Sequence, residues 1–176
     1  MNAAGFARMH ARMVAFPDVV SMLVATLTEE DARWRPPSGA WSVIEIVNHL
    51  ADEDVDDFGT RLRLLLESPD LAWPPIDPEG AATERGYNER DLAESLARFS
   101  ANRDGASAWL AAVGPDADWE TKKTHPVFGS MLAGELMTAW AAHDQLHLRQ
   151  LGKRLYELTL RDAGGYSAEY AGAAPT

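Results

Sequence analysis

The periodicity of the apolar residues is the feature that most constrains the fold of this chain. Apolar side chains recur at steps of three or four along almost the whole sequence, and no segment alternates as a half-buried strand does. Such steps place side chains on one face of an α-helix, which is buried against other helices. The sequence therefore predicts an all-α fold, an up-down four-helix bundle. A length of 176 residues suits a single domain over residues 1–176.

Proline, glycine and one capping motif divide the chain into helices and connections. Ser42 to Glu45 form a capping box, in which the hydroxyl and the carboxylate each bond a free backbone N–H at a helix start. Four prolines make residues 68–86 a long crossover loop, and residues 153–176 form a short C-terminal extension. The predicted helices are a first one that follows Phe16-Pro17, then residues 42–67, 88–113 and 130–151.

Composition narrows the class of partner and the class of metal site. The net charge of −11, with scattered Lys and Arg, argues against nucleic acid or an anionic membrane as the main partner. The chain shows neither a membrane-spanning apolar run nor a signal-peptide layout at its start, so we expect a cytoplasmic protein. With no cysteine, any metal must be bound by His, Asp or Glu.

Two histidines interrupt the apolar face of the last predicted helix. His143 and His147 stand four residues apart, so both imidazoles can bind one ion from the same helix face. A third ligand must come from another helix, and His49 is the remaining histidine within a helix that packs into the core. His10 and His125 are less suitable. The face that contains the pair consists of Leu132, Leu136, Trp140, His143, His147 and Leu151.

The histidine pair has simpler explanations as well. On an ordinary helix such a pair is more often a surface pair or a hydrogen-bonded core pair than a metal site. Burial of the two histidines favours the metal site over these explanations, because imidazole nitrogens in a bundle interior need hydrogen-bond or metal partners. Asp144 follows His143, so the sequence lacks the H-E-x-x-H motif and a zincin-type protease is disfavoured.

Other side chains near the three histidines are candidates for supporting roles. Glu53, one turn after His49, and Asp54, in a gap of the apolar stripe, are candidate bases, and no other catalytic residue is identified. Asp144 is a candidate for a hydrogen bond to a ligating imidazole. Two tryptophans are candidates for pocket walls, although core packing is the commoner role: Trp41 and Trp140.

Three segments together resemble the DinB-like (YfiT-like) family of metal-dependent enzymes. They are Trp41 to Leu50, His125 to Gly129, and His143 to Leu151, and the resemblance covers roughly residues 34–151. It implies a four-helix bundle, often a homodimer, with one divalent ion on a histidine of the second helix and two of the fourth. At matching positions these are His49, His143 and His147. The family includes hydrolases, and thiol S-transferases and isomerases that use low-molecular-weight thiols.

We therefore predict a divalent-metal-dependent enzyme for a small-molecule substrate, of the thiol S-transferase or hydrolase type. Three imidazoles suit Zn²⁺, Ni²⁺, Fe²⁺ or Co²⁺ and leave a position for water or a thiol, which the ion activates as nucleophile. A thiol cosubstrate and a homodimer are implied by the resemblance alone. The alternative is a non-catalytic metal- or small-ligand-binding bundle of the stress-response type, and a metal-free scaffold is the third hypothesis.

Overall fold

The computed structural model describes residues 1–125 and 127–175, so Pro126 of the segment His125 to Gly129 and Thr176 lie outside the described residues. The chain folds as an all-α four-helix bundle, as predicted. Within the described part of the chain, each helix is too short or too polar to cross a membrane. The bundle is formed by α1 (Ala3–Val24), α3 (Val43–Asp56) continued by α4 (Phe58–Glu67), α6 (Leu92–Val113) and α7 (Ala133–Asp162).

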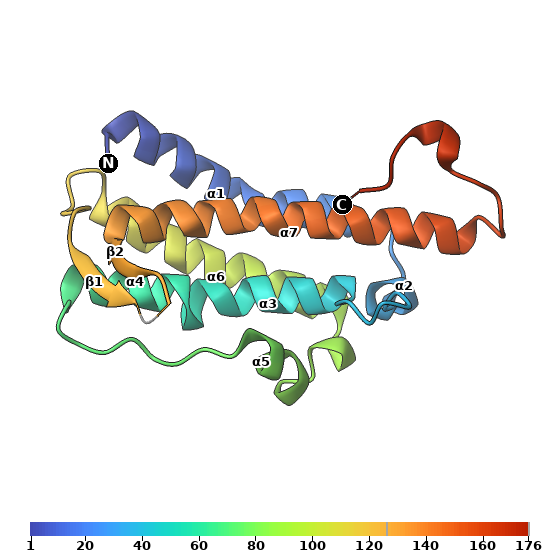
Figure 1. Ribbon diagram of the computed structural model, residues 1–176, viewed down its shortest axis with the longest axis horizontal. Coiled ribbons are helices and arrows are strands. Elements are labelled where there is room, and N and C mark those ends of the chain that lie inside the picture. Colours follow the sequence, from blue (N-terminus) through green and yellow to red (C-terminus); the bar gives the residue numbers. More distant parts are fainter. Residues whose placement is uncertain (126, 176) are drawn as a thin grey trace.

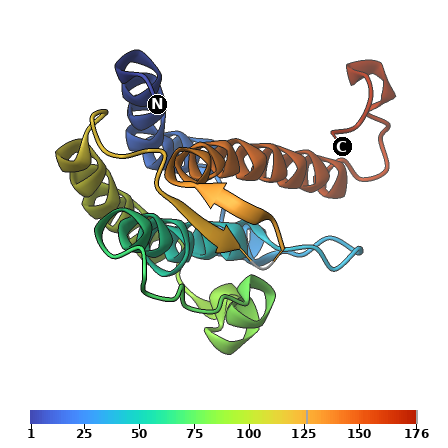
Figure 2. The same ribbon diagram turned by 60° about the vertical axis from the view of Figure 1, so that its left-hand side comes forward.

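The helix directions explain the length of the crossover. α1 and α7 run one way along the bundle, and α3 and α6 run the other way (Figure 1). Asn48 Nδ2 donates to Ser95 Oγ at 2.9 Å and Asn102 Nδ2 donates to the Ala51 carbonyl at 2.8 Å, so α3 and α6 are parallel neighbours. A tight turn cannot join parallel helices, and the chain must return along the bundle. This return contains α5 (Pro78–Glu84) and the 3₁₀-helix η1 (Tyr87–Glu89), which lie outside the bundle along α3 (Figures 1 and 2).

The first helix begins much earlier than predicted. α1 begins at Ala3, where the Asn2 side chain accepts the Gly5 N–H at 2.8 Å, and the predicted start after Phe16 is wrong. Pro17 lies inside the helix and has no N–H to donate to the Met13 carbonyl. That carbonyl instead accepts a hydrogen bond from Arg103 Nη1 of α6, at 3.0 Å. A tertiary contact thus replaces the bond that proline removes.

The predicted N-terminal caps of α3 and α6 differ in outcome. The capping box of α3 is confirmed, because the Glu45 N–H donates to Ser42 Oγ at 3.3 Å and the Ser42 N–H donates to Glu45 Oε2 at 2.9 Å. The predicted cap at Asn88 is wrong. Asn88 lies in η1, where its Oδ1 accepts from Ser42 Oγ at 2.6 Å, and α6 begins after Asp91 instead.

The predicted helix over residues 42–67 is broken between α3 and α4. Asp57 at the break has φ −113° and ψ −92°, and Thr60 Oγ1 donates to the Val55 carbonyl at 2.5 Å. Gly59 fits closely there, because a Cβ atom at this position would lie 1.9 Å from the Asp54 carbonyl oxygen. The break ends α3 at Asp56 and lets α4 begin at Phe58.

A short hairpin precedes α7 and corrects the expectation that the chain has no strand. β1 (Lys122–His125) and β2 (Gly129–Leu132) pair antiparallel. β1 is polar throughout and β2 has its two apolar residues side by side, so neither shows the apolar–polar alternation by which strands are recognised. α7 therefore begins at Ala133 rather than Ser130. It also continues through Gly152 to Asp162, since one glycine weakens a helix by only about 1 kcal/mol. The C-terminal extension carries the 3₁₀-helix η2 (Glu169–Ala171).

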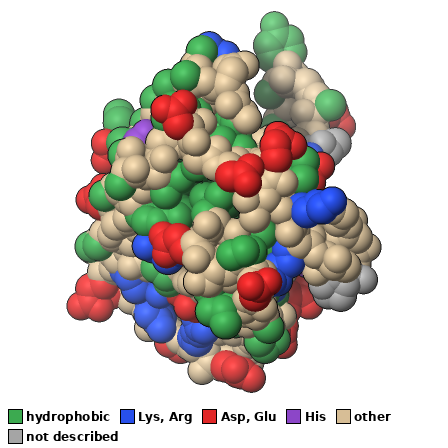
Figure 3. Space-filling view, turned by 90° about the vertical axis from the view of Figure 1, so that its left-hand side faces the viewer, with side chains coloured by type: hydrophobic (Ala, Val, Ile, Leu, Met, Phe, Trp, Pro, Cys, Tyr) green, Lys and Arg blue, Asp and Glu red, His purple; other side chains and the backbone are tan. Residues whose placement is uncertain are grey.

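The core consists of two apolar clusters with polar side chains between them. Trp140 of α7 belongs to the cluster at the hairpin end of the bundle, and Leu151 belongs to the other. The α7 residues between these two positions include His143, Asp144 and His147. At the hairpin end, hydrophobic side chains gather at the centre of the surface with charged groups around them (Figure 3). The polar layer between the clusters is therefore the part of the interior available for chemistry.

Candidate metal centre

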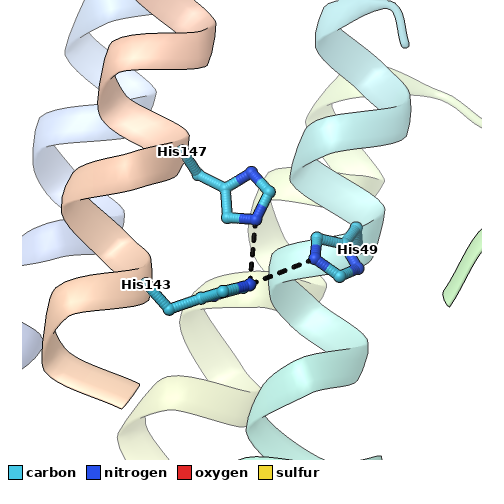
Figure 4. A group of neighbouring side chains, drawn as sticks. All are labelled: His49, His143 and His147. Atoms are coloured by element: carbon cyan, nitrogen blue, oxygen red, sulfur yellow. Dashed lines mark hydrogen bonds between the residues drawn. The ribbon is translucent and has the colours of Figure 1, made fainter. Parts of the chain in front are cut away.

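The three histidines predicted to share a metal lie together between α3 and α7. Figure 4 shows His49 on α3 facing His143 and His147 on α7. The Nε2 atom of His143 is 3.4 Å from Nε2 of His49 and 3.0 Å from Nε2 of His147. One ligand atom from each ring lies within 4.8 Å of the others. One helical turn brings together the pair on α7, and antiparallel packing of α3 against α7 adds the third ring.

Aromatic rings enclose the histidines. The Trp41 ring lies 4.9 Å from the His49 ring, and the Phe58 ring lies 5.1 Å from the His143 ring, measured between centroids. The prediction that Trp41 forms a wall is thus supported by its position. Phe58, at the start of α4, has a similar place beside His143, which the sequence alone does not indicate. Both rings shield the imidazoles from water.

Burial keeps the imidazoles neutral. Burial, together with the neighbouring histidines, lowers the pKa of His49 to about 3 and that of His143 to about 2. Burial also lowers the pKa of His147. His147 Nδ1 donates to Gln150 Oε1 at 2.7 Å, which places the ring proton on Nδ1 and leaves the Nε2 lone pair free. Neutral rings with free lone pairs are the form that binds metal ions.

The donor set fits a divalent transition ion. Zinc–nitrogen distances of about 2.0–2.1 Å in a tetrahedral site place two nitrogens about 3.3 Å apart, close to the separations of 3.0 and 3.4 Å observed here. Three neutral imidazoles cannot satisfy one another, because each contact between two Nε2 atoms needs a proton on one of them. His143 Nδ1 is in addition buried without a hydrogen-bond partner among the described residues.

Two carboxylates stand beside the histidines. Glu53 Oε1 is 3.5 Å from His49 Nδ1, as expected for residues one turn apart. Burial and the charge of Asp57 raise the Glu53 pKa to about 8. Burial also raises the Asp57 pKa, which the Arg61 guanidinium opposes from 2.7 Å. Asp57 sits at the break between α3 and α4. The sequence does not indicate this position, because a continuous helix would place Asp57 among solvated acidic residues.

The structure corrects the roles expected of Asp54 and Asp144. Arg103 Nη2 donates to Asp54 Oδ1 at 2.9 Å, and Arg103 Nη1 donates to Asp144 Oδ2 at 2.7 Å. These side chains are buried, so Asp54 is held in an ion pair rather than facing the histidines as a base. Asp144 is held in the same way rather than bonding an imidazole. Trp140 Nε1 donates to Asp54 Oδ1 at 3.0 Å, which makes Trp140 a core residue.

The spacing of residues in the sequence indicates the contact of Gln150 but not those of Arg103. Gln150 follows His147 by three residues, which is a helical spacing, so its contact with His147 was open to inference. Arg103 carries no comparable signal, because its partners lie on other helices.

A cavity of about 990 Å³ opens beside the histidines. Its walls come from α3, α4 and α7, and from the loop before α3 and the start of α5. A volume of this size suits a small organic molecule. The residues that line it are Gly39, Ala40, Trp41, His49, Glu53, Asp57, Phe58, Asp77, Pro78, Glu79, His143 and Gln150.

Known proteins share both sequence and fold with this chain. A protein of Oceanobacillus iheyensis that bears the name "putative metal-dependent hydrolase" is 27% identical over 135 residues, which are 77% of each chain. The structure of YfiT from Bacillus subtilis, described as "a probable metal-dependent hydrolase with an unusual four-helix bundle topology", superposes with a TM-score of 0.77. The two chains are 20% identical, and the match covers 95% of this chain and 91% of YfiT, so it shows a shared fold.

The family match covers most of the chain. A family model described as the DinB superfamily matches residues 12–151. This range includes the four bundle helices, apart from the ends of α1 and α7, together with His49, His143 and His147. The fold, the three-histidine cluster and the family model thus agree, and the chain belongs to the DinB superfamily.

Proposed function

We propose that this protein is a metal-dependent hydrolase acting on a small molecule. The observation that carries the proposal is the convergence of three neutral imidazole Nε2 atoms beside a cavity that His49, His143 and Glu53 line. Three protein ligands leave a coordination position for water or substrate, which is typical of catalytic rather than structural zinc sites. The names of the relative from Oceanobacillus iheyensis and of YfiT support the same class of reaction.

The residues at the site have different roles in the proposed hydrolysis. His49, His143 and His147 would hold a divalent ion, which would supply a Lewis acid that lowers the pKa of water and polarises a carbonyl. Glu53 stands next to His49 in the same cavity, where the charge of a bound cation would favour its ionised form. That carboxylate would accept the proton of the attacking water and later return it to the leaving group. Gln150 holds His147 in the tautomer that presents Nε2. Trp41 and Phe58 limit access of bulk water.

The first experiment measures metal content and turnover in the same samples. We expect tag-free protein to contain about one divalent ion per chain. His143→Ala should lose the ion, whereas the matched control His10→Gln should keep it, since His10 bonds the Ser107 carbonyl on a distant part of the bundle. Hydrolysis of 4-nitrophenyl esters should disappear with the ion. Glu53→Gln should retain the ion and lose hydrolysis, which separates binding from proton transfer.

The same samples distinguish the alternatives. Transfer of a low-molecular-weight thiol to a chromogenic electrophile, without ester hydrolysis, would replace hydrolase by S-transferase at the same site. A stoichiometric ion with neither reaction would favour a non-catalytic binding bundle. Full metal content and full turnover in His143→Ala would refute the site itself.

A further inference from the structure

A second cavity, of about 760 Å³, adjoins the cavity that His49 and His143 line. The two share Asp57, Phe58 and His143 as lining residues, so they meet at the proposed metal centre. The second cavity lies between α4, the hairpin and α7, and its volume also suits a small organic molecule. Most of its remaining wall is apolar, formed by Ile76, Phe128, Met131, Leu136, Ala142 and Leu146.

The charged groups of this second cavity neutralise each other. Arg61 Nε lies 2.7 Å from Asp57 Oδ1, and both side chains are largely buried. The Arg61 guanidinium also donates to the Pro74 carbonyl at 3.2 Å and lies over the Trp73 ring. A guanidinium with these partners is not free to select an anionic group. The cavity therefore suits a neutral, apolar group.

The hairpin contributes one histidine, His125, to the lining of this second cavity. His125 Nδ1 accepts the backbone N–H groups of Val127, at 3.0 Å, and Phe128, at 3.2 Å. A nitrogen that accepts these bonds carries no proton, so the ring proton of His125 is on Nε2.

We propose that the second cavity binds the apolar part of the substrate and that His125 Nε2 donates a hydrogen bond to a neutral acceptor on it. The substrate class is an uncharged small molecule with an alkyl or aryl group on a carbonyl compound. Its scissile bond lies at the wall that both cavities share, beside His143. This inference rests on the proposed hydrolase function, which it extends by naming the substrate class.

The test uses a homologous series of straight-chain primary amides, from acetamide to octanamide, titrated calorimetrically into metal-free and metal-loaded protein. Burial of each added methylene should lower the dissociation constant about fourfold until the cavity is full. Ala142→Phe occupies the cavity and should remove this gain for the longer amides. Gln145→Phe, an exposed position of α7 outside the cavity, is the matched control.

His125→Asn tests the hydrogen bond separately. The asparagine Oδ1 takes the place of Nδ1 and can still accept the two backbone N–H groups, but the Nε2–H is gone. We expect weaker binding of every amide by about the same factor, roughly 2- to 10-fold, with the gain per methylene unchanged. An unchanged affinity in this variant would refute the role of His125.

The outcomes keep this inference apart from the proposed function. Equal affinity along the series, or equal losses in Ala142→Phe and Gln145→Phe, would overturn the apolar subsite even if the protein hydrolyses esters. Preserved chain-length dependence in a protein without metal or turnover would support the subsite and reject the hydrolase. Circular dichroism checks the fold of Ala142→Phe, and Leu146→Asn, at an exposed cavity residue, serves as a second variant.

Discussion

Burial of ionisable side chains beside the histidines determines how the site responds to pH. Burial lowers the pKa of each imidazole and raises that of Glu53, so both kinds of side chain favour their neutral form in the folded protein. A site of neutral groups avoids the free energy of desolvating charges in a bundle interior. The same neutral imidazoles are ready to bind a cation near pH 7.

Glu53→Gln should stabilise the metal-free protein most at high pH. The Glu53 pKa rises from 4.5 to about 8 on folding, so between these values the folded state holds a proton that the unfolded state has released. The stability of the wild type therefore falls as pH rises through this range, by about 1.4 kcal/mol for each pKa unit of the shift. The glutamine side chain of the variant does not ionise, so its stability lacks this dependence on pH. Urea unfolding at about pH 5 and about pH 8.5 should show a larger gain for the variant at the higher pH.

The control for this measurement is Glu30→Gln, which changes an exposed carboxylate of α2 (Glu29–Arg33). A similar trend with pH in both variants would contradict the assignment to Glu53.

At the scale of helices, Arg103 connects the elements that carry the site. Its guanidinium on α6 bonds Asp54 of α3, Asp144 of α7 and the Met13 carbonyl of α1. Asp144 directly follows His143, and Asp54 lies on the same helix as His49. The distance between α3 and α7, and with it the separation of the imidazoles, is therefore fixed by this buried ion pair network.

Arg103→Met should destabilise the protein by about 3–5 kcal/mol, because it leaves two buried carboxylates without a cation. The control Arg161→Met breaks an ion pair with Asp31 in which the side chains are 30% and 22% exposed. The control should therefore lose less than about 1 kcal/mol. Urea midpoints at constant m value measure both. Equal losses in the two variants would show that Arg103 acts as an ordinary surface cation.

The helix break between α3 and α4 should make one glycine irreplaceable. Alanine at Gly59 would meet the Asp54 carbonyl, whereas alanine at Gly105 of α6 would meet no atom within 4 Å. Gly59→Ala should destabilise the protein by about 1–3 kcal/mol through overpacking. Gly105→Ala should stabilise it by about 0.5–1 kcal/mol through the better helix propensity of alanine. Thermal unfolding compares the two, and stabilisation by both would mean that the break is absent in solution.

For the whole molecule, a metal at the three histidines would connect α3 to α7 in the polar layer between two apolar clusters. These clusters lie on either side of the site, so we expect the fold to persist without the ion. The metal then adds stability by binding to the folded state alone. The homodimer implied by the family resemblance stays a prediction, as does a thiol cosubstrate.

Zinc at about 100 times its dissociation constant should stabilise the protein by about 2.7 kcal/mol. For a chain of this size this corresponds to a rise in Tm of about 5–10 °C. A chelator should reverse the rise and leave the far-ultraviolet circular dichroism helical, and His49→Ala should show no rise. Unfolding on chelation at room temperature would instead identify the ion as structural.

The sequence by itself determined the features that depend on one helix at a time. Apolar steps of three and four predicted the bundle, and the spacing of His143 and His147 placed two imidazoles on one face. The capping box located the start of α3. His49 followed because few histidines lie within core helices. Such features are local, since the geometry of a single helix fixes them.

Only the tertiary structure decided the features that depend on contacts between distant segments. The guanidinium of Arg103 pairs Asp54 and Asp144 and bonds the carbonyl that Pro17 leaves free, which turns two candidate site residues into structural ones. The break at Asp57 brings that carboxylate to the site. Each of these outcomes depends on which side chain on another helix lies opposite. The spacing of residues along the chain carries no information about that, because burial and pairing are properties of the packed interior.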